Sequence, residues 1–199
     1  LGALAIFLYV GGEVSIGSFL VNYFSESSIA GLSSAEAGEM VAYYWGAAMI
    51  GRLVGAALMN YVASTKYLAV NALVAIIMII VSMNSAGVIL AFELPSLLAR
   101  VSVFGFAFSE SYSINVAMWS ILAVGFFNSI MFPTIFTLAV KGLGSLTSKG
   151  SSLVCQGIVG GALIPVVQGV AADSIGIQMS FIVPMLCYIY IGWYALRGA

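Results

Sequence analysis

Six apolar segments, each long enough to cross a bilayer, dominate this chain of 199 residues. Short stretches rich in Gly, Ser, Asn and charged residues separate them, and such residues end helices. Because lipid cannot satisfy an exposed backbone, each segment is expected to be an α-helix. The predicted spans cover residues 3–24, 40–63, 67–85, 116–140, 151–172 and 179–196. The sequence therefore predicts an all-α integral membrane protein, with one six-transmembrane-helix bundle as its single domain.

The composition narrows the function. Only 7% of the residues are charged, against about a quarter in soluble domains. A net charge of −1 argues against nucleic acid as a partner, because binding it needs concentrated Lys and Arg. The absence of His removes the usual general base and the commonest metal ligand. Cys155 and Cys187 lie in apolar runs, which is typical of small buried side chains. We therefore expect no enzyme, no metal and no cofactor.

The charged residues divide between the two ends of the predicted bundle. If the six helices alternate across the membrane, Lys66, Lys141, Lys149 and Arg197 share one side, while the acidic connections share the other. Loops rich in Lys and Arg are usually cytoplasmic. Both ends of this segment are therefore predicted to be cytoplasmic.

Residues 86–115 contain a further apolar run that is almost long enough to span. A seventh span would move Lys141 and Lys149 to the acidic side and destroy the charge separation. We therefore favour an outside insertion, either a re-entrant or an interfacial helix, with a seventh span as the alternative.

Glu13 is the most unusual residue of the first predicted helix. An ionised carboxylate in hydrocarbon costs about 2.5 to 3.5 kcal/mol even on lenient scales, so Glu13 must be neutral or face protein or water. Intramembrane acids are usually functional, although a carboxyl buried between helices is an open alternative. Ser15, Ser18 and Asn22 lie on the other side of a regular helix. We expect Glu13 and Asn22 near different levels of one cavity.

Other polar residues sit inside the second, fourth and fifth predicted helices. Asn128 and Phe132 are four residues apart and share a helix face, and Gln156 lies in the fifth span. An amide beside an aromatic ring suits a sugar, although contacts between helices explain each residue equally well. Arg52 could extend toward the cytoplasmic side or form an ion pair. Tyr43, Tyr44 and Trp45, at the outer end of the second helix, fit an interfacial aromatic belt at least as well as a binding wall.

Small residues predict close helix packing. Gly51 and Gly55 on the second helix, and Gly157 and Gly161 on the fifth, repeat every four residues and allow neighbouring backbones to approach. Pro133 and Pro165 lie inside the fourth and fifth predicted helices, where each removes a backbone hydrogen bond and should kink the helix.

Four long motifs, taken together, resemble a known family. They are YVGGEVSIGSFLVNYF (9–24), YYWGAAMIGRLVG (43–55), FNSIMFPTIFTLAVKGLG (127–144) and GSSLVCQGIVGGALIPVVQGVAADSIG (150–176). They are similar to the bacterial fucose permease and glucose/galactose transporter group of the major facilitator superfamily. The resemblance implies two six-helix halves around a central cavity, with alternating access by rocking. The six spans here would be the seventh to twelfth helices, the C-terminal half of a twelve-helix sugar:proton symporter.

The resemblance also implies what is missing. In the family the N-terminal half carries the acidic residue associated with proton coupling, so that half is the expected partner. The chain begins with Leu, and a fragment is therefore expected. The family joins its ninth and tenth helices by a short outside loop, so the segment 88–115 is a departure. The resemblance implies that the first, second, fourth and fifth helices line the cavity, in the inner membrane of a bacterium.

These observations predict secondary active transport of a hexose or deoxyhexose with protons. The expected sugar contacts are Glu13, Asn22, Asn128, Gln156 and Phe132, with Arg52 in a structural or gating ion pair. The rival hypothesis is a truncated, non-transporting membrane protein that acts only as a packing or interaction module.

Overall fold

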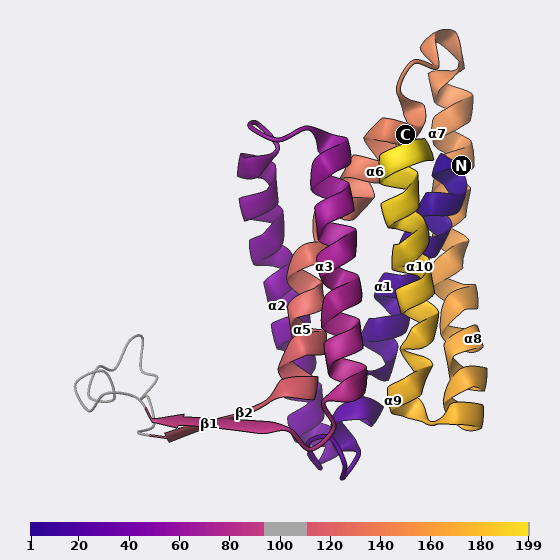
Figure 1. The fold of residues 1–199 in the computed structure, drawn as a ribbon. Coiled ribbons are helices and arrows are strands. Elements are labelled where there is room, and N and C mark those ends of the chain that lie inside the picture. Colours follow the sequence, from indigo (N-terminus) through magenta and orange to yellow (C-terminus); the bar gives the residue numbers. More distant parts are fainter. Residues whose placement is uncertain (94–110, 199) are drawn as a thin grey trace.

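A bundle of long helices forms the body of the computed structural model, which describes residues 1–93 and 111–198 (Figure 1). Six helical stretches in it are long and apolar enough to cross a membrane, so the predicted six-helix membrane architecture is confirmed. The α-helices are α1 (Gly2–Ser25), α2 (Ser34–Leu58), α3 (Ser64–Asn84), α5 (Val116–Asn128), α6 (Met131–Val140), α7 (Thr147–Gln156), α8 (Gly160–Ile175), α9 (Ile177–Ser180) and α10 (Ile182–Trp193). Short 3-10 turns cover Gly144–Leu146 and Gly157–Val159, and a π-helical turn covers Tyr194–Gly198.

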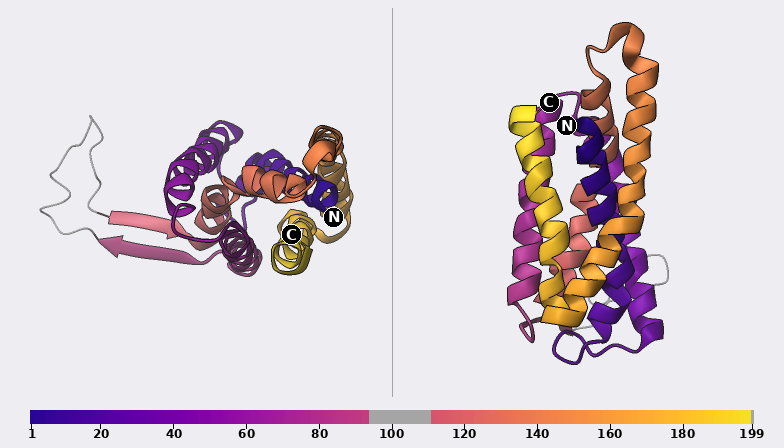
Figure 2. Two further views of the ribbon diagram at one scale, coloured as in Figure 1. Left: turned by 90° about the horizontal axis from the view of Figure 1, so that it is seen from above. Right: turned by 90° about the vertical axis from the view of Figure 1, so that its right-hand side faces the viewer.

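Helix α1 is the centre of the bundle. It contacts α2, α5, α6, α7, α8, α9 and α10, and its Tyr23 hydroxyl reaches the Ser82 carbonyl on α3. Seen from above, α2, α1 and the α7–α8 stretch follow one side of the bundle, while α3 and α10 follow the other (Figure 2). Only a narrow stripe of α2 is buried, namely Ala37, Tyr44, Ala48, Gly51 and Gly55. The side formed by α2, α1 and α7–α8 therefore keeps much of its surface uncovered.

Glycines allow the closest helix contacts, as the sequence predicts. At Gly157 an added Cβ would lie 2.6 Å from the carbonyl oxygen of Ala3 on α1. At Gly51 it would fall on the carbonyl oxygen of Phe126 on α5. These contacts bring backbones together where the membrane offers no hydrophobic driving force between helices.

Helix α2 begins at Ser34, well before the predicted Met40, and ends at Leu58. Its start is set by a capping box: Ser33 Oγ accepts from the Glu36 amide at 3.3 Å, and the Ser33 amide donates to Glu36 Oε2 at 2.9 Å. The cap extends the helix into polar residues that hydropathy alone assigns to the loop.

A two-stranded antiparallel ribbon leaves the bundle at the end opposite the termini (Figure 1). Strand β1 (Ile89–Glu93) pairs with β2 (Ser111–Asn115), with Ile89 opposite Asn115 and Glu93 opposite Ser111. The Asn115 side chain then caps α5, accepting from the Met118 amide at 3.0 Å, and its Nδ2 donates to the Ile29 carbonyl.

The ribbon differs from the helix predicted for residues 86–115. Residues 89–93 and 111–115 are strands, so the predicted re-entrant or interfacial helix is wrong for these ten positions. The two strands satisfy each other's backbone groups, which removes the need for a helix there. The prediction for residues 94–110 lies outside the described residues.

The ribbon end of the bundle is also joined by side-chain hydrogen bonds. The Tyr23 hydroxyl on α1 donates to the Ser82 carbonyl on α3 at 3.0 Å, and Ser82 Oγ donates to the Ala117 carbonyl on α5 at 2.7 Å. Gln178 Nε2 on α9 donates to the Met83 carbonyl at 2.7 Å. Four helices are thus linked at this end by bonds between buried or half-buried groups.

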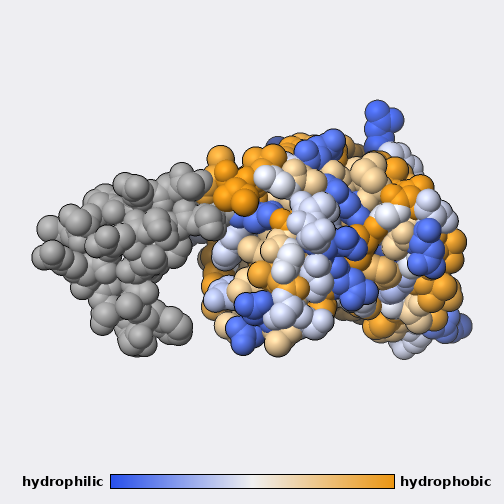
Figure 3. Space-filling model, turned by 90° about the horizontal axis from the view of Figure 1, so that it is seen from below, coloured by the Kyte–Doolittle hydropathy of each residue, from blue (hydrophilic) through white to orange (hydrophobic). Residues whose placement is uncertain are grey.

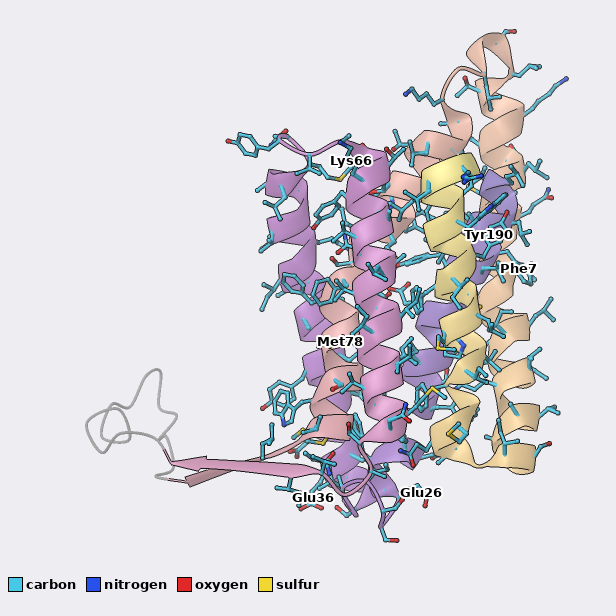
Figure 4. The ribbon with its side chains drawn as sticks, viewed as in Figure 1. Phe7, Glu26, Glu36, Lys66, Met78 and Tyr190 are labelled. Atoms are coloured by element: carbon cyan, nitrogen blue, oxygen red, sulfur yellow. The ribbon has the colours of Figure 1, made fainter. Side chains whose placement is uncertain are left out.

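The two ends of the bundle carry opposite charge. Lys66 lies at the end that holds both termini, whereas Glu26 and Glu36 lie at the ribbon end (Figure 4). Viewed toward the ribbon end, hydrophilic residues are spread among intermediate ones (Figure 3). The arrangement agrees with the charge separation expected from the sequence.

Replacing Gly160 with Ala should lower the free energy of unfolding by about 2 kcal/mol, the usual scale of an overpacked contact. Gly160 has an ordinary helical conformation (φ −54°, ψ −33°), so alanine suits its backbone. The added Cβ would, however, fall on the Phe7 carbonyl oxygen and lie 3.0 Å from the Phe7 Cα, both of them backbone atoms. The measurement is a heating series in detergent followed by size-exclusion chromatography.

Gly169→Ala on the same helix is the matched control, because its Cβ would meet only the Phe19 Cζ, at 3.8 Å. That variant should be neutral or more stable than the parent chain. Equal melting of the Gly160 and Gly169 variants would contradict the close α1–α8 contact.

Candidate functional site

The fourth membrane stretch is broken between α5 and α6, at Ser129 and Ile130. Pro133 has no N–H, so the Ser129 carbonyl, four residues earlier, has no helical donor. Arg52 Nε on α2 donates to that carbonyl at 3.1 Å. The Ile130 carbonyl accepts from both the amide and the hydroxyl of Thr134, at 3.3 and 2.7 Å. Polar groups therefore concentrate at this break.

Two buried tyrosines meet Asn128 at the same break. The Tyr9 hydroxyl on α1 donates to the Asn128 carbonyl at 3.0 Å. Asn128 Nδ2 donates to the Tyr44 hydroxyl on α2 at 2.8 Å. Tyr44 and Asn128 are 0% exposed and Tyr9 is 1% exposed. Asn128 thus joins three helices in the middle of the bundle.

Two polar atoms beside these bonds have no partner. Asn128 Oδ1 and the Tyr188 hydroxyl on α10 are both buried without a hydrogen bond. The two side chains are close enough to interact. Buried polar groups are nearly always paired, so orphaned ones mark a place where a further hydrogen-bonding group is expected. We call Tyr9, Tyr44, Asn128 and Tyr188 the Asn128 cluster.

Glu13 and Arg52 flank the Asn128 cluster. Glu13 is half-buried and lies one helical turn from Tyr9, near the hydroxyls of Tyr9 and Tyr44. The Arg52 guanidinium is near enough to act on Glu13 through its charge. Among residues 1–93 and 111–198, however, no carboxylate is in salt-bridge contact with Arg52, and its hydrogen bond goes to a backbone carbonyl. The ion pair expected for Arg52 stays a prediction.

Phe132 closes the cluster on the α6 side. Its ring centroid is 6.2 Å from that of Tyr9, at an angle of 58°, and 6.4 Å from that of Phe136. The arrangement combines aromatic rings, an amide and a carboxylate. This combination suits a neutral ligand that carries several hydroxyl groups.

The structure brings together three of the five predicted sugar contacts. Glu13, Asn128 and Phe132 surround one region, whereas Asn22 and Gln156 are exposed on α1 and α7. Ser15 is fully buried, and its Oγ donates to Gln168 Oε1 on α8 at 2.6 Å. Gln168 Nε2 in turn donates to Ser180 Oγ at 3.3 Å. Ser15 is therefore engaged between helices.

The three tyrosines of the Asn128 cluster were not among the predicted sugar contacts. Tyr44 was assigned equally to an interfacial belt, but it is buried, and only its neighbours Tyr43 and Trp45 are exposed. Tyr9 carries a usable signal, because it is four residues before Glu13 and so shares its side of the helix. Tyr188 carries no such signal, since nothing in the apolar run 177–196 distinguishes it.

Within the described part of the chain, no three His, Cys, Asp or Glu side chains come together as metal ligands.

Known proteins resemble this chain closely. It is 48% identical over its whole length to a glucose/galactose transporter of Brucella abortus, and 44% identical over 99% of its length to a putative glucose/galactose transporter of Helicobacter pylori. It is 30% identical over 93% of its length to the L-fucose-proton symporter of Escherichia coli. No family model matches the chain.

A solved transporter structure has the same fold as this chain. The crystal structure of FucP, a major facilitator superfamily transporter in the outward conformation, superimposes on the whole chain with a TM-score of 0.82 and 28% identity. The match covers 41% of that chain, and the chain spans 42% of the length of its Brucella and Helicobacter relatives.

The chain therefore has the fold of one half of a major facilitator superfamily transporter. Within that superfamily it is related to the group that contains the glucose/galactose transporters and the fucose–proton symporter. These relatives are named as transporters and not as enzymes.

Tyr9→Phe should destabilise the chain by about 1 kcal/mol, within the range of hydrogen bonds between membrane helices. The change removes the only side-chain donor to the Asn128 carbonyl among the contacts described here. Tyr61→Phe is the control, because Tyr61 is 88% exposed. The measurement is the melting temperature of each variant in detergent. An equal decrease for both variants, or no decrease for either, would contradict the Asn128 cluster.

Proposed function

We propose that this chain is the C-terminal half of a sugar:proton symporter that carries a glucose-, galactose- or fucose-type sugar. It works by alternating access, together with an N-terminal six-helix half. The similarity of the chain to part of transporters named for these sugars supports the substrate class.

The observation that carries the proposal is the Asn128 cluster at the α5–α6 break. Transporter sites form at discontinuous helices near the middle of the membrane, because freed backbone groups and polar side chains are available there. In this chain the break unites α1, α2 and α5 in one hydrogen-bonded cluster.

Each predicted contact receives a place in this proposal. Glu13, Asn128 and Phe132 act at the level of the break, where Glu13 bonds a sugar hydroxyl and Phe132 packs against the sugar ring. Asn22, exposed two to three turns further along α1, acts at a level nearer the ribbon end. Gln156, exposed on α7, acts at the opposite level. The uncovered side of α2, α1 and α7–α8 receives the partner half.

Proton coupling belongs to the complete transporter. The family resemblance assigns the coupling acid to the N-terminal half, so this half contributes sugar contacts and the moving wall. The rocking of the two halves alternately opens each side of the membrane.

The proposed location is the inner membrane of a bacterium, with both ends of this segment cytoplasmic. The end with the termini carries Lys66, and the positive-inside rule directs that end inward. In a chain whose Cys155 and Cys187 are changed to Ser, a membrane-impermeant maleimide should label Ser27→Cys in intact cells. It should label Ser148→Cys only after permeabilisation. The reverse pattern would overturn the proposed orientation.

Uptake of labelled glucose, galactose and fucose tests the function itself. Vesicles would hold this chain alone, or this chain with an N-terminal half from one of its relatives, under an inward proton gradient. We expect uptake only from the paired halves, and we expect Glu13→Gln to reduce its efficiency roughly tenfold by removing a charge-assisted hydrogen bond.

Glu39→Gln is the matched control, because Glu39 is exposed near the start of α2, away from the break. Its uptake should equal that of the parent chain. Correctly inserted pairs that take up none of the three sugars would refute the transport proposal and favour a non-transporting interaction module.

A further inference from the structure

Arg52 has a backbone partner that the family resemblance does not predict. We infer that Arg52 is a positioning residue, which replaces the amide hydrogen that Pro133 lacks and thereby holds Asn128 in place at the α5–α6 break. The link to sugar binding rests on the proposed function, whereas the structural link stands alone.

The hydrogen bonds around the break support this role. Two consecutive carbonyls, those of Asn128 and Ser129, accept from side chains of other helices, Tyr9 and Arg52. Ser129 Oγ cannot serve the Ser129 carbonyl, because it donates to the Phe126 carbonyl at 2.8 Å. Arg52 Nε is therefore the donor that the described structure provides for the carbonyl orphaned by Pro133.

Close packing makes the contact possible. Gly51 precedes Arg52, and a Cβ there would fall on the Phe126 carbonyl oxygen and lie 2.6 Å from Ser129 Oγ. The backbone of α2 thus runs directly against the turn that precedes the break. From this position the Arg52 Nε donates to the Ser129 carbonyl oxygen at 3.1 Å.

An arginine suits this task for two reasons. It is always charged, so it donates strongly to a carbonyl that lacks its helical donor. Its planar group also has several donors in fixed directions, and Nε uses only one of them.

The consequence for Asn128 is geometric. Asn128 and Ser129 are consecutive. Fixing the Ser129 carbonyl to α2 therefore fixes the plane of the Ser129–Ile130 peptide bond, one residue after Asn128. The Asn128 side chain also bonds to α2, through Tyr44. Arg52 and Tyr44 therefore hold adjacent residues of the break against the same helix.

A double-mutant cycle tests the inference. Arg52→Met removes the donor and keeps a long apolar side chain, while Pro133→Ala supplies a backbone N–H four residues after Ser129. Arg52→Met alone should lower the melting temperature in detergent by on the order of 5 °C. In the Pro133→Ala background, Arg52→Met should lower the melting temperature by less than half as much. Equal costs in both backgrounds would overturn the inference.

Pro165→Ala is the matched control, because Pro165 lies inside α8, far along the chain from the Arg52 contact. In that background Arg52→Met should keep its full cost. A reduced cost there as well would show a general effect of removing proline, and would also overturn the inference.

Uptake by paired halves gives the second readout. Arg52→Met should raise the half-saturating sugar concentration several-fold, and Pro133→Ala should restore part of it; a merely structural role would lower the amount of active protein without moving that concentration. An unchanged half-saturating concentration would overturn the positioning role. If the paired parent halves transport none of the sugars, the proposed function fails, while the melting cycle still decides whether Arg52 replaces the missing amide hydrogen.

Discussion

Inside a bilayer every backbone N–H and C=O must find a partner within the protein, and this constraint shapes the whole chain. Most residues meet it with regular helices. At the α5–α6 break the helix fails to do so, and side chains from α1 and α2 complete the bonding of the Asn128 and Ser129 carbonyls. The same break brings the Tyr9 hydroxyl and the Arg52 guanidinium onto these two carbonyls. The candidate site is therefore a product of backbone satisfaction as much as of ligand recognition.

Hydropathy was sufficient to predict six membrane helices, because a span needs about twenty apolar residues whatever its neighbours are. Hydropathy did not predict where these helices begin and end. Helix α2 starts where Ser33 and Glu36 cap each other, in residues that are not apolar. The ribbon was missed for a related reason: its strands gain stability only from each other, across a separation along the chain that local patterns do not reveal.

The site was predictable in part. Glu13 and Asn128 attract notice because polar groups are costly in a membrane, and the structure places both beside the α5–α6 break. Tyrosine cannot be singled out in this way, because its ring is compatible with an apolar segment. The role of its hydroxyl becomes clear only when the hydrogen-bond partner is known. Arg52 was recognised as unusual, yet its partner is a carbonyl, and side-chain sequence patterns say nothing about which carbonyls a proline leaves open.

The hydrogen bonds at the ribbon end have a mechanical meaning. Tyr23, Ser82 and Gln178 join α1, α3, α5 and α9, and the Ser15, Gln168 and Ser180 side chains add α8 to the same connected set. Sliding any one of these helices past its neighbour would break a bond that lipid cannot replace. This end of the bundle therefore resists shear, and the five helices are expected to move together there as one rigid unit.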